Sequence, residues 1–317
     1  MTILDQLTAN LLDLLFELEG RGIPIMIGGG YGLFLKRRHL AATGERTLLE
    51  NLPEARATND LDMFLRAELL SDLARTREVR EAIVRLGYTP VEEAKFLQWR
   101  RAIVVAGVSQ EVKIDVLVGP LGKFRPKLKV SMPRVRPRGD IQFHAHAVEE
   151  AVLLEDHPIT VQVTGVRSTG DPYAGTVEVP EAFPYLMMKL HAFADRKADD
   201  NKDLGRHHAL DAYTIVAMMT EPEYERAKRT GAEQSGDSNV QRARAIVRED
   251  FSSETGMGIL RLREHRLFKP DFQLDPFRQV LREVFPDAAE SKGQTCPVNL
   301  QGAQALLPPD REGQRKA

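Results

Sequence analysis

Hydrophobic positions at the start of the chain recur at helical spacing. They fall mostly three or four residues apart, at Ile3, Leu4, Leu7, Leu11, Leu14, Leu15 and Leu18. Such spacing places them on one face of a helix, and Gly20 with Gly22 marks its end. A short apolar run over residues 23–27 then stops at Gly28-Gly29-Gly30, and residues 31–40 return to a helical pattern. This part of the chain predicts a helix, a buried strand, a glycine turn and a second helix.

The rest of the chain alternates between the period of two that is typical of strands and the period of 3.6 that is typical of helices. Short or alternating apolar runs predict strands at residues 60–65, 97–106, 112–118, 159–163 and 176–179. Helical spacing predicts helices at residues 67–86, from Pro180 and Pro184 to about 198, 204–219, 239–249 and 276–285. We therefore expect an α/β (α+β) core with a mixed sheet over residues 1–175, an α-helical domain over 176–287 and a disordered tail over 288–317.

Composition places only weak limits on the class of protein. The 317 residues are enough for two domains, and the 44 basic and 46 acidic residues nearly cancel. Any nucleic-acid partner must therefore be held by a local basic patch. The single cysteine, Cys296, excludes an internal disulfide framework, and no segment has the composition of a signal peptide or a membrane span. We expect a cytoplasmic protein without a membrane partner.

One segment is strongly basic. Residues 123–138 contain no acidic residue, and their basic residues are Lys123, Arg125, Lys127, Lys129, Arg134, Arg136 and Arg138. Pro126, Pro133 and Pro137 discourage regular structure, which indicates a loop or an irregular sheet edge. Clustered positive charge can follow an RNA backbone, although most such segments are simply solvated.

Three aspartates carry the clearest chemistry. The alternation of a strand puts Asp60 and Asp62 on one face, while Leu61 and Met63 turn into the core. Over residues 112–118 the same alternation turns Asp115 away from the core, so a third carboxylate can join the pair from a neighbouring strand. Like charges this close repel, and hard divalent Mg²⁺ or Mn²⁺ is their natural partner.

Three carboxylates can hold two divalent ions. In a two-metal site one ion activates an attacking hydroxyl, and the other neutralises charge on a triphosphate. We expect Asp115 to lie nearest the hydroxyl, as a metal ligand or as a base.

The glycine turn is a candidate phosphate cradle. Backbone N–H groups at a helix N-terminus bind phosphate, and glycines allow a close approach. The turn does not match a dinucleotide fingerprint, because Leu33 stands where a third glycine would be needed. It also lacks the Gly-Lys-Ser/Thr ending of a Walker loop. The turn is a candidate site because it precedes the strand that carries Asp60.

These motifs together resemble a known group of enzymes. The motifs are Gly28-Gly29-Gly30, Arg56-Ala57-Thr58-Asn59-Asp60-Leu61-Asp62 and Lys113-Ile114-Asp115. They resemble the DNA polymerase beta nucleotidyltransferase superfamily. Further motifs are similar to its AbiEii/AbiGii-type toxin branch: Val179-Pro180-Glu181, Lys189-Leu190-His191-Ala192, Asp195-Arg196, Lys202-Asp203 and Asp211. The resemblance spans residues 20–215. It departs from the family at Gly30, where a serine is common, and in the longer gap before Asp60.

The resemblance implies a role for each matching residue. It implies metal binding by Asp60, Asp62 and Asp115, and nucleotide binding by Gly28, Gly29, Gly30, Arg56, Thr58, Lys189 and Asp203. Lys189 would contact the triphosphate and, with Asp211, complete the catalytic set. Either Asp203 or Asp211 is the late acidic residue that orients Lys189 or the acceptor, and the sequence leaves that choice open. The alternative for Lys189 is a lysine that snorkels from an apolar helix face.

The function that the resemblance implies is transfer of a nucleoside monophosphate from an NTP, such as ATP, to an acceptor. The acceptor would be an RNA such as the tRNA 3′ end, and the chain would be a toxin with a cognate antitoxin. One alternative is a small-molecule nucleotidyltransferase of the antibiotic-modifying kind. Another is a catalytically silent binding protein with the same fold. His207 with Asp211, or His144 with His146, could also bind a metal, but neither pair has a third ligand at suitable spacing.

Overall fold

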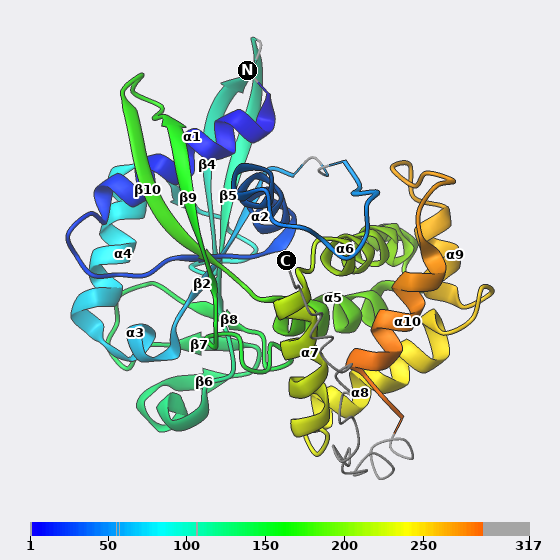
Figure 1. Ribbon diagram of the computed structural model, residues 1–317. Helices are drawn as coiled ribbons and strands as arrows, with labels where there is room; N and C mark the ends of the chain where they lie inside the picture. The colour runs from blue at the N-terminus through cyan, green and yellow to red at the C-terminus, as the bar shows by residue number, and fades with distance from the viewer. Residues whose placement is uncertain (1, 55, 57, 106, 288–317) are drawn as a thin grey trace, which may run out of the picture.

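The computed structural model describes residues 2–54, 56, 58–105 and 107–287 (Figure 1). The tail predicted at residues 288–317, with Cys296, lies outside the described residues. In the first part of the chain the helices are α1 (Ile3–Glu17), α2 (Gly29–Thr43), α3 (Ala67–Ser71) and α4 (Leu73–Arg85). The later ones are α5 (Ala182–Arg196), α6 (Arg206–Ala217), α7 (Glu221–Glu233), α8 (Ser238–Ile246), α9 (Met257–Arg263) and α10 (Leu274–Val284). Short helical segments are η1 (Gly122–Lys127), η2 (Asp200–Gly205) and η3 (Val247–Phe251).

The strands form one mixed sheet. Their bounds are β1 (Met26–Ile27), β2 (Asp60–Leu65), β3 (Thr89–Pro90), β4 (Gln98–Val105), β5 (Val108–Val118), β6 (Lys129–Ser131), β7 (Arg134–Arg136), β8 (Ala145–Ala147), β9 (Ile159–Val166) and β10 (Pro172–Val179). The order across the sheet is β6-β7-β8-β5-β2-β1-β10-β9, and β4 pairs with β5 and with β3. Strand β2 runs parallel to β5 and antiparallel to β1. The centre of the sheet therefore carries both candidate aspartate strands side by side.

The sheet confirms the alternation expected on these two strands. In β2, Leu61 and Met63 are buried while Asp60 and Asp62 are partly exposed. In β5, the valines and isoleucine from Val112 to Val118 are buried and Asp115 is partly exposed. The apolar side of each strand packs into the core, so the carboxylates share the opposite face.

Several predicted elements differ in extent. The strand predicted at residues 23–27 is reduced to β1, and the helix predicted at residues 67–86 is broken at Asp72. The Asp72 carboxylate accepts hydrogen bonds from the N–H groups of Ala74 and Arg75 and so begins a new helix. The segment predicted as a basic loop contains η1 and the β6–β7 hairpin at the sheet edge. Helices α7 and α9 were not predicted.

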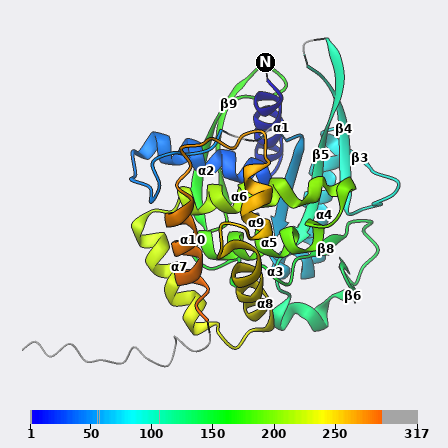
Figure 2. The same ribbon diagram turned by 90° about the vertical axis from the view of Figure 1, so that its right-hand side faces the viewer.

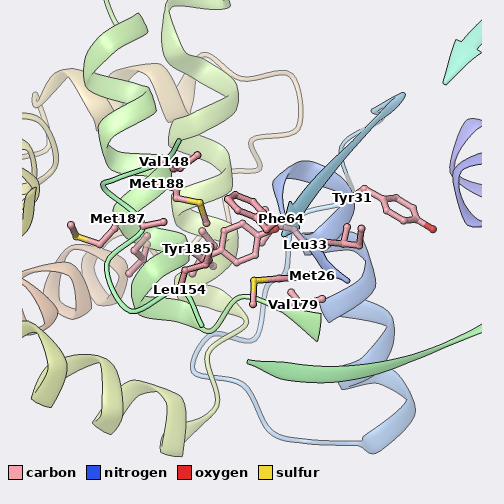
Figure 3. Packing of buried hydrophobic residues seen from close by; sticks show 14 of the residues in the cluster. Met26, Tyr31, Leu33, Phe64, Val148, Leu154, Val179, Tyr185, Met187 and Met188 are labelled. Atoms are coloured by element: carbon pink, nitrogen blue, oxygen red, sulfur yellow. The ribbon is translucent and has the colours of Figure 1, made fainter. Parts of the chain in front are cut away.

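Helices α5 to α10 gather on one side of the sheet (Figures 1 and 2). The boundary predicted after residue 175 falls within β10, which stays in the sheet to Val179. Figure 3 shows how the two parts meet: Tyr185 and Met188 of α5 lie beside Phe64 of β2, with Val148 next to them. Within the described residues no helix has the length and apolar character needed to cross a membrane.

Candidate functional site

A cleft of about 620 Å³ opens between the sheet and the helical region. Its sheet side is lined by Gly29, Arg56, Asp60, Asp62, Phe64, Leu117, His146, Val148 and Glu150. Its helical side is lined by Tyr185, Met188, Lys189, Ala192, Arg196, Asn201, Lys202, Asp203, His207 and His208. The sheet side thus presents three carboxylates, and the helical side presents three cations and two histidines together with the carboxylate of Asp203.

The aspartates come together through strand register. Asp62 on β2 is directly opposite Asp115 on the parallel strand β5, and Asp60 is opposite Lys113. Within the described residues, no hydrogen-bond donor or cation directly contacts the carboxylate of Asp60 or Asp62. Both carboxylates are therefore available to a ligand.

Burial dominates the ionisation of all three aspartates. It raises the pKa of Asp60 against the opposing charges of Lys113 and Arg56. It also raises the pKa of Asp62, which Lys189 lowers and Asp60 raises. For Asp115, burial and the charge of Asp62 together raise the pKa to about 6. A cluster of this kind gains stability from a bound cation.

Asp115 differs from the other two in its surroundings. Its Oδ1 accepts a hydrogen bond from Nε2 of Gln98 at 2.5 Å. Asp60 and Asp62 line the cleft, whereas Asp115 does not, although Leu117 on the same face of β5 does. Among the residues described, no group of three or more histidine, cysteine, aspartate or glutamate side chains is arranged to hold a metal ion.

The glycine turn leaves room for the side chains of two site residues that pack against it. Gly29 has φ +61°, and a Cβ there would lie 1.5 Å from Oδ2 of Asp62. A Cβ at Gly30 would lie 2.6 Å from a terminal nitrogen of Arg56. The Gly28 N–H donates to the backbone carbonyl of Asp62 at 2.8 Å, and Gly28 precedes the first residue of α2. Of the three glycines, Gly29 lines the cleft.

Lys189 forms a buried ion pair on the helical side. Its Nζ lies 2.7 Å from Oδ2 of Asp211, and Arg56 lies 3.5 Å from the same oxygen. Burial opposes ionisation of Asp211, yet the charges of Lys189 and Arg56 hold its pKa well below the usual value. Lys189 is therefore paired inside the protein while it lines the cleft, which a simply snorkelling lysine would not be.

The two late acidic residues occupy different places. Asp211 is 2% exposed and supports Lys189 and Arg56, whereas Asp203 lines the cleft and pairs with Arg206 at 2.9 Å. Thr58 accepts a hydrogen bond from the Asp60 N–H at 3.3 Å, at the entry to β2.

The histidine pairs considered from the sequence have other partners. His207 bonds to His265 and lies 3.5 Å from Asp203. His144 bonds to Arg134, and His146 lines the cleft. Neither pair belongs to a group of three or more metal-holding side chains in the described part of the chain.

Sequence reasoning missed several residues of the cleft. Tyr185 donates from its hydroxyl to the carbonyl of Gly29 at 2.6 Å, which ties α5 to the glycine turn. Glu150, Asn201 and His208 also line the cleft. These residues carried no local signal, because the cleft forms only where α5, η2, α6 and the segment after β8 meet β2.

Comparisons with known proteins do not assign the chain to a family. No protein-family model matches the chain, and a search of curated proteins found no match.

Proposed function

We propose that the chain is a metal-dependent nucleotidyltransferase that moves a nucleoside monophosphate from an NTP to an acceptor and releases pyrophosphate. The observation that carries the proposal is the cleft itself. Asp60 and Asp62 lie on its sheet side without a cationic partner in contact, and Lys189 and Arg56 lie beside them. A metal-bound triphosphate has the complementary charge pattern, with a cation at one position and anionic oxygens at the next.

The carboxylates fit Mg²⁺ as it is usually bound with nucleotides. Mg²⁺ prefers oxygen ligands and is commonly held by one or two carboxylates together with substrate phosphates, without a complete protein cage. Asp60 and Asp62 supply two such carboxylates, and Asp115 beside Asp62 is a third candidate. A bound Mg²⁺ would neutralise phosphate charge and lower the pKa of an attacking hydroxyl.

The helical side of the cleft supplies the phosphate contacts. Lys189, Arg196 and Lys202 line it, and Arg56 reaches it from the sheet side. Asp211 holds the Lys189 ammonium in place by a 2.7 Å ion pair. We assign Asp211 as a positioning residue for Lys189, and Lys189, which lines the cleft, as the residue that contacts the triphosphate.

Asp115 is the residue we assign to the acceptor hydroxyl. It lies directly opposite Asp62 in the strand register, beside the carboxylates that would hold the metal. Gln98 binds Oδ1 and so leaves Oδ2 for this role. Loss of the proton from the acceptor hydroxyl prepares its oxygen to attack the α-phosphate.

An RNA acceptor is supported by the basic hairpin β6–β7. Lys129 and Arg136 stand directly opposite each other on it, and neither has an acidic partner among the described residues. Like charges in opposed positions destabilise a sheet, and phosphates would offset that repulsion. The hairpin continues toward the cleft, because Arg134 pairs in register with the cleft residue His146. The toxin role and its antitoxin rest on the sequence resemblance alone.

The test is label transfer from each α-labelled NTP, with Mg²⁺ and total tRNA. We expect labelled tRNA with the wild type, and at least a 100-fold loss in Asp60→Asn and Asp62→Asn. Glu93→Gln, an exposed carboxylate outside the cleft, is the control and should keep full activity. Transfer that survives both aspartate substitutions would refute the mechanism. Label in a small molecule but never in RNA would favour an antibiotic-modifying type of enzyme.

A further inference from the structure

One wall of the cleft contains a series of three polar side chains that the proposed reaction does not use. Asp203 and His207 line the cleft, and His265 lies behind them, 5% exposed, after the end of α9. Nδ1 of His207 lies 2.9 Å from Nε2 of His265, and Nε2 of His207 lies 3.5 Å from Oδ2 of Asp203. The three side chains therefore form one series that ends in the cleft.

Backbone geometry determines where the protons of this series lie. The Leu267 N–H donates to Nδ1 of His265 at 3.1 Å. A neutral imidazole carries one proton, so His265 carries it on Nε2 and donates to Nδ1 of His207. His207 then carries its own proton on Nε2, which faces Asp203. Burial lowers the pKa of both histidines, to about 4 for His265, so both are neutral at pH 7.

These proton positions exclude one use of the series. Nδ1 of His207 accepts from His265 and Nε2 carries a proton, so neither nitrogen is free to bind a metal. Of the three side chains in this series, the Asp203 carboxylate is the acceptor that faces the cleft. Arg206 holds its Oδ1 at 2.9 Å, and the longer contact of His207 with Oδ2 leaves that oxygen with capacity for a further donor.

The backbone around Asp203 supports a specific placement of this carboxylate. Asp203, Leu204 and Gly205 have φ values of +56°, +50° and +72°. Aspartate tolerates this left-handed region, but leucine rarely adopts it. The surrounding structure therefore holds this segment in a conformation that is unfavourable for leucine. That conformation places the Asp203 side chain at the cleft.

The neighbours of Asp203 indicate what it binds. Asn201, Lys202, His207 and His208 line this part of the cleft and are polar, whereas the apolar lining residues Phe64, Leu117, Val148 and Met188 come from the sheet side and α5. A base needs an apolar or stacking wall, and a phosphate would be repelled by a carboxylate. Hydroxyl groups are the donors that suit an ionised carboxylate in a polar setting.

We propose that Asp203 binds a ribose hydroxyl, with His207 and His265 as positioning residues that fix the carboxylate, so that this wall selects ribonucleotides over 2′-deoxyribonucleotides. The inference rests on the proposed function for its substrate class. The sugar belongs either to the NTP or to the 3′-terminal residue of the acceptor RNA, and binding measurements separate these two sources.

The experiment measures binding, so it does not depend on turnover. Equilibrium dialysis with the full chain and Mg²⁺ compares the four NTPs with their four 2′-deoxy counterparts. A second series compares RNA oligonucleotides that end in a ribose or in a 2′-deoxyribose. In at least one series we expect the wild type to favour the ribose form by about 10-fold to 100-fold, as for a hydrogen bond to a charged group.

Variants assign that preference to the series of side chains. Asp203→Asn keeps a residue that tolerates the left-handed region and should abolish the preference. His207→Ala and His265→Ala should reduce it, and His207→Gln, which restores an N–H donor, should recover part of it. Asp195→Asn, an exposed carboxylate outside the cleft, should leave it unchanged.

Two results would overturn the inference. One is equal wild-type binding of ribose and 2′-deoxyribose forms in both series. The other is an Asp203→Asn variant that weakens both forms by the same factor. A ribose preference that depends on Asp203, found in a protein that transfers no label, would contradict only the proposed function.

Discussion

Asp62 occupies the space that a side chain at position 29 would need. A Cβ at Gly29 would lie 1.5 Å from Oδ2 of Asp62, and the backbone of Gly29 has φ +61°. The glycine turn and the aspartate strand thus form one unit, in which the first allows the second to point into the cleft.

Gly29→Ala tests this relationship. We expect it to lower the free energy of unfolding by more than the roughly 1–3 kcal/mol of backbone strain, because the clash with Asp62 adds to that strain. Gly20→Ala is the matched control, since Gly20 has φ +72° but nothing within 4 Å of a new Cβ. Urea unfolding measures both. Equal losses of unfolding free energy in the two variants would show that the Asp62 side chain moves aside at no cost.

The buried pair of Lys189 and Asp211 predicts that substitutions can restore the stability of the protein without restoring its activity. Asp211→Asn leaves Lys189 without its carboxylate partner, and we expect a loss of about 3–5 kcal/mol in the free energy of unfolding. The double variant Lys189→Met/Asp211→Leu should regain most of that stability but no transfer activity. Asp195→Asn, which breaks an exposed pair with Arg242, should change stability by less than about 1 kcal/mol. Full activity in the double variant would remove Lys189 from the mechanism.

The raised pKa of Asp115 predicts how stability depends on pH. Its folded pKa of about 6 lies above the ordinary value of 3.8, so the folded state binds more protons than the unfolded state between these values. Without Mg²⁺, the contribution of Asp115 to stability should therefore rise as the pH falls from 7 through 6 towards 4, while the buried histidines with lowered pKa values act in the opposite direction. Asp115→Asn removes only the Asp115 contribution, so the stability of the wild type relative to this variant should rise over the same range. Denaturant unfolding at pH 7 and pH 5 gives the comparison.

Mg²⁺ should stabilise the folded state at the same carboxylates as protons do, and the two should compete for them. At pH 7 we expect added Mg²⁺ to raise the melting temperature of the wild type, because a cation relieves the repulsion among Asp60, Asp62 and Asp115. The Asp60→Asn/Asp62→Asn double variant should be more stable than the wild type without Mg²⁺ and should not respond to it. A wild type that does not respond even with an NTP present would contradict metal binding here.

The basic hairpin predicts a change in RNA affinity that leaves nucleotide binding intact. Arg136→Glu replaces the repulsion with Lys129 by an attraction, so the hairpin should be at least as stable as before. The same change should weaken tRNA binding and reduce its salt dependence, which filter binding at several salt concentrations measures. Arg229→Glu makes the same charge change on an exposed part of α7 and serves as the control. Equal effects of the two variants would mean that only net charge matters.

Some features could be read from local pattern because they depend on local geometry. The alternation in residues 60–65 and 112–118 predicted which side chains face the core, since a strand has a period of two whatever it pairs with. The basic segment was recognised by charge, but its β6–β7 hairpin was not predicted because its prolines argued against regular structure. Helix α7 was not recognised, although Thr220 and Glu223 form a capping box at its start.

The site residues divide in the same way. The local pattern predicted that Asp60 and Asp62 share a face, that Asp115 lies outward on its own strand and that a glycine turn leads into a helix. The register of Asp62 with Asp115, the pairing of Lys189 with Asp211 and the contact of His265 with His207 emerged from the folded structure alone. Periodicity acts within one segment, whereas these contacts depend on strand order and on the docking of α5 and α6 against the sheet, which no local pattern encodes.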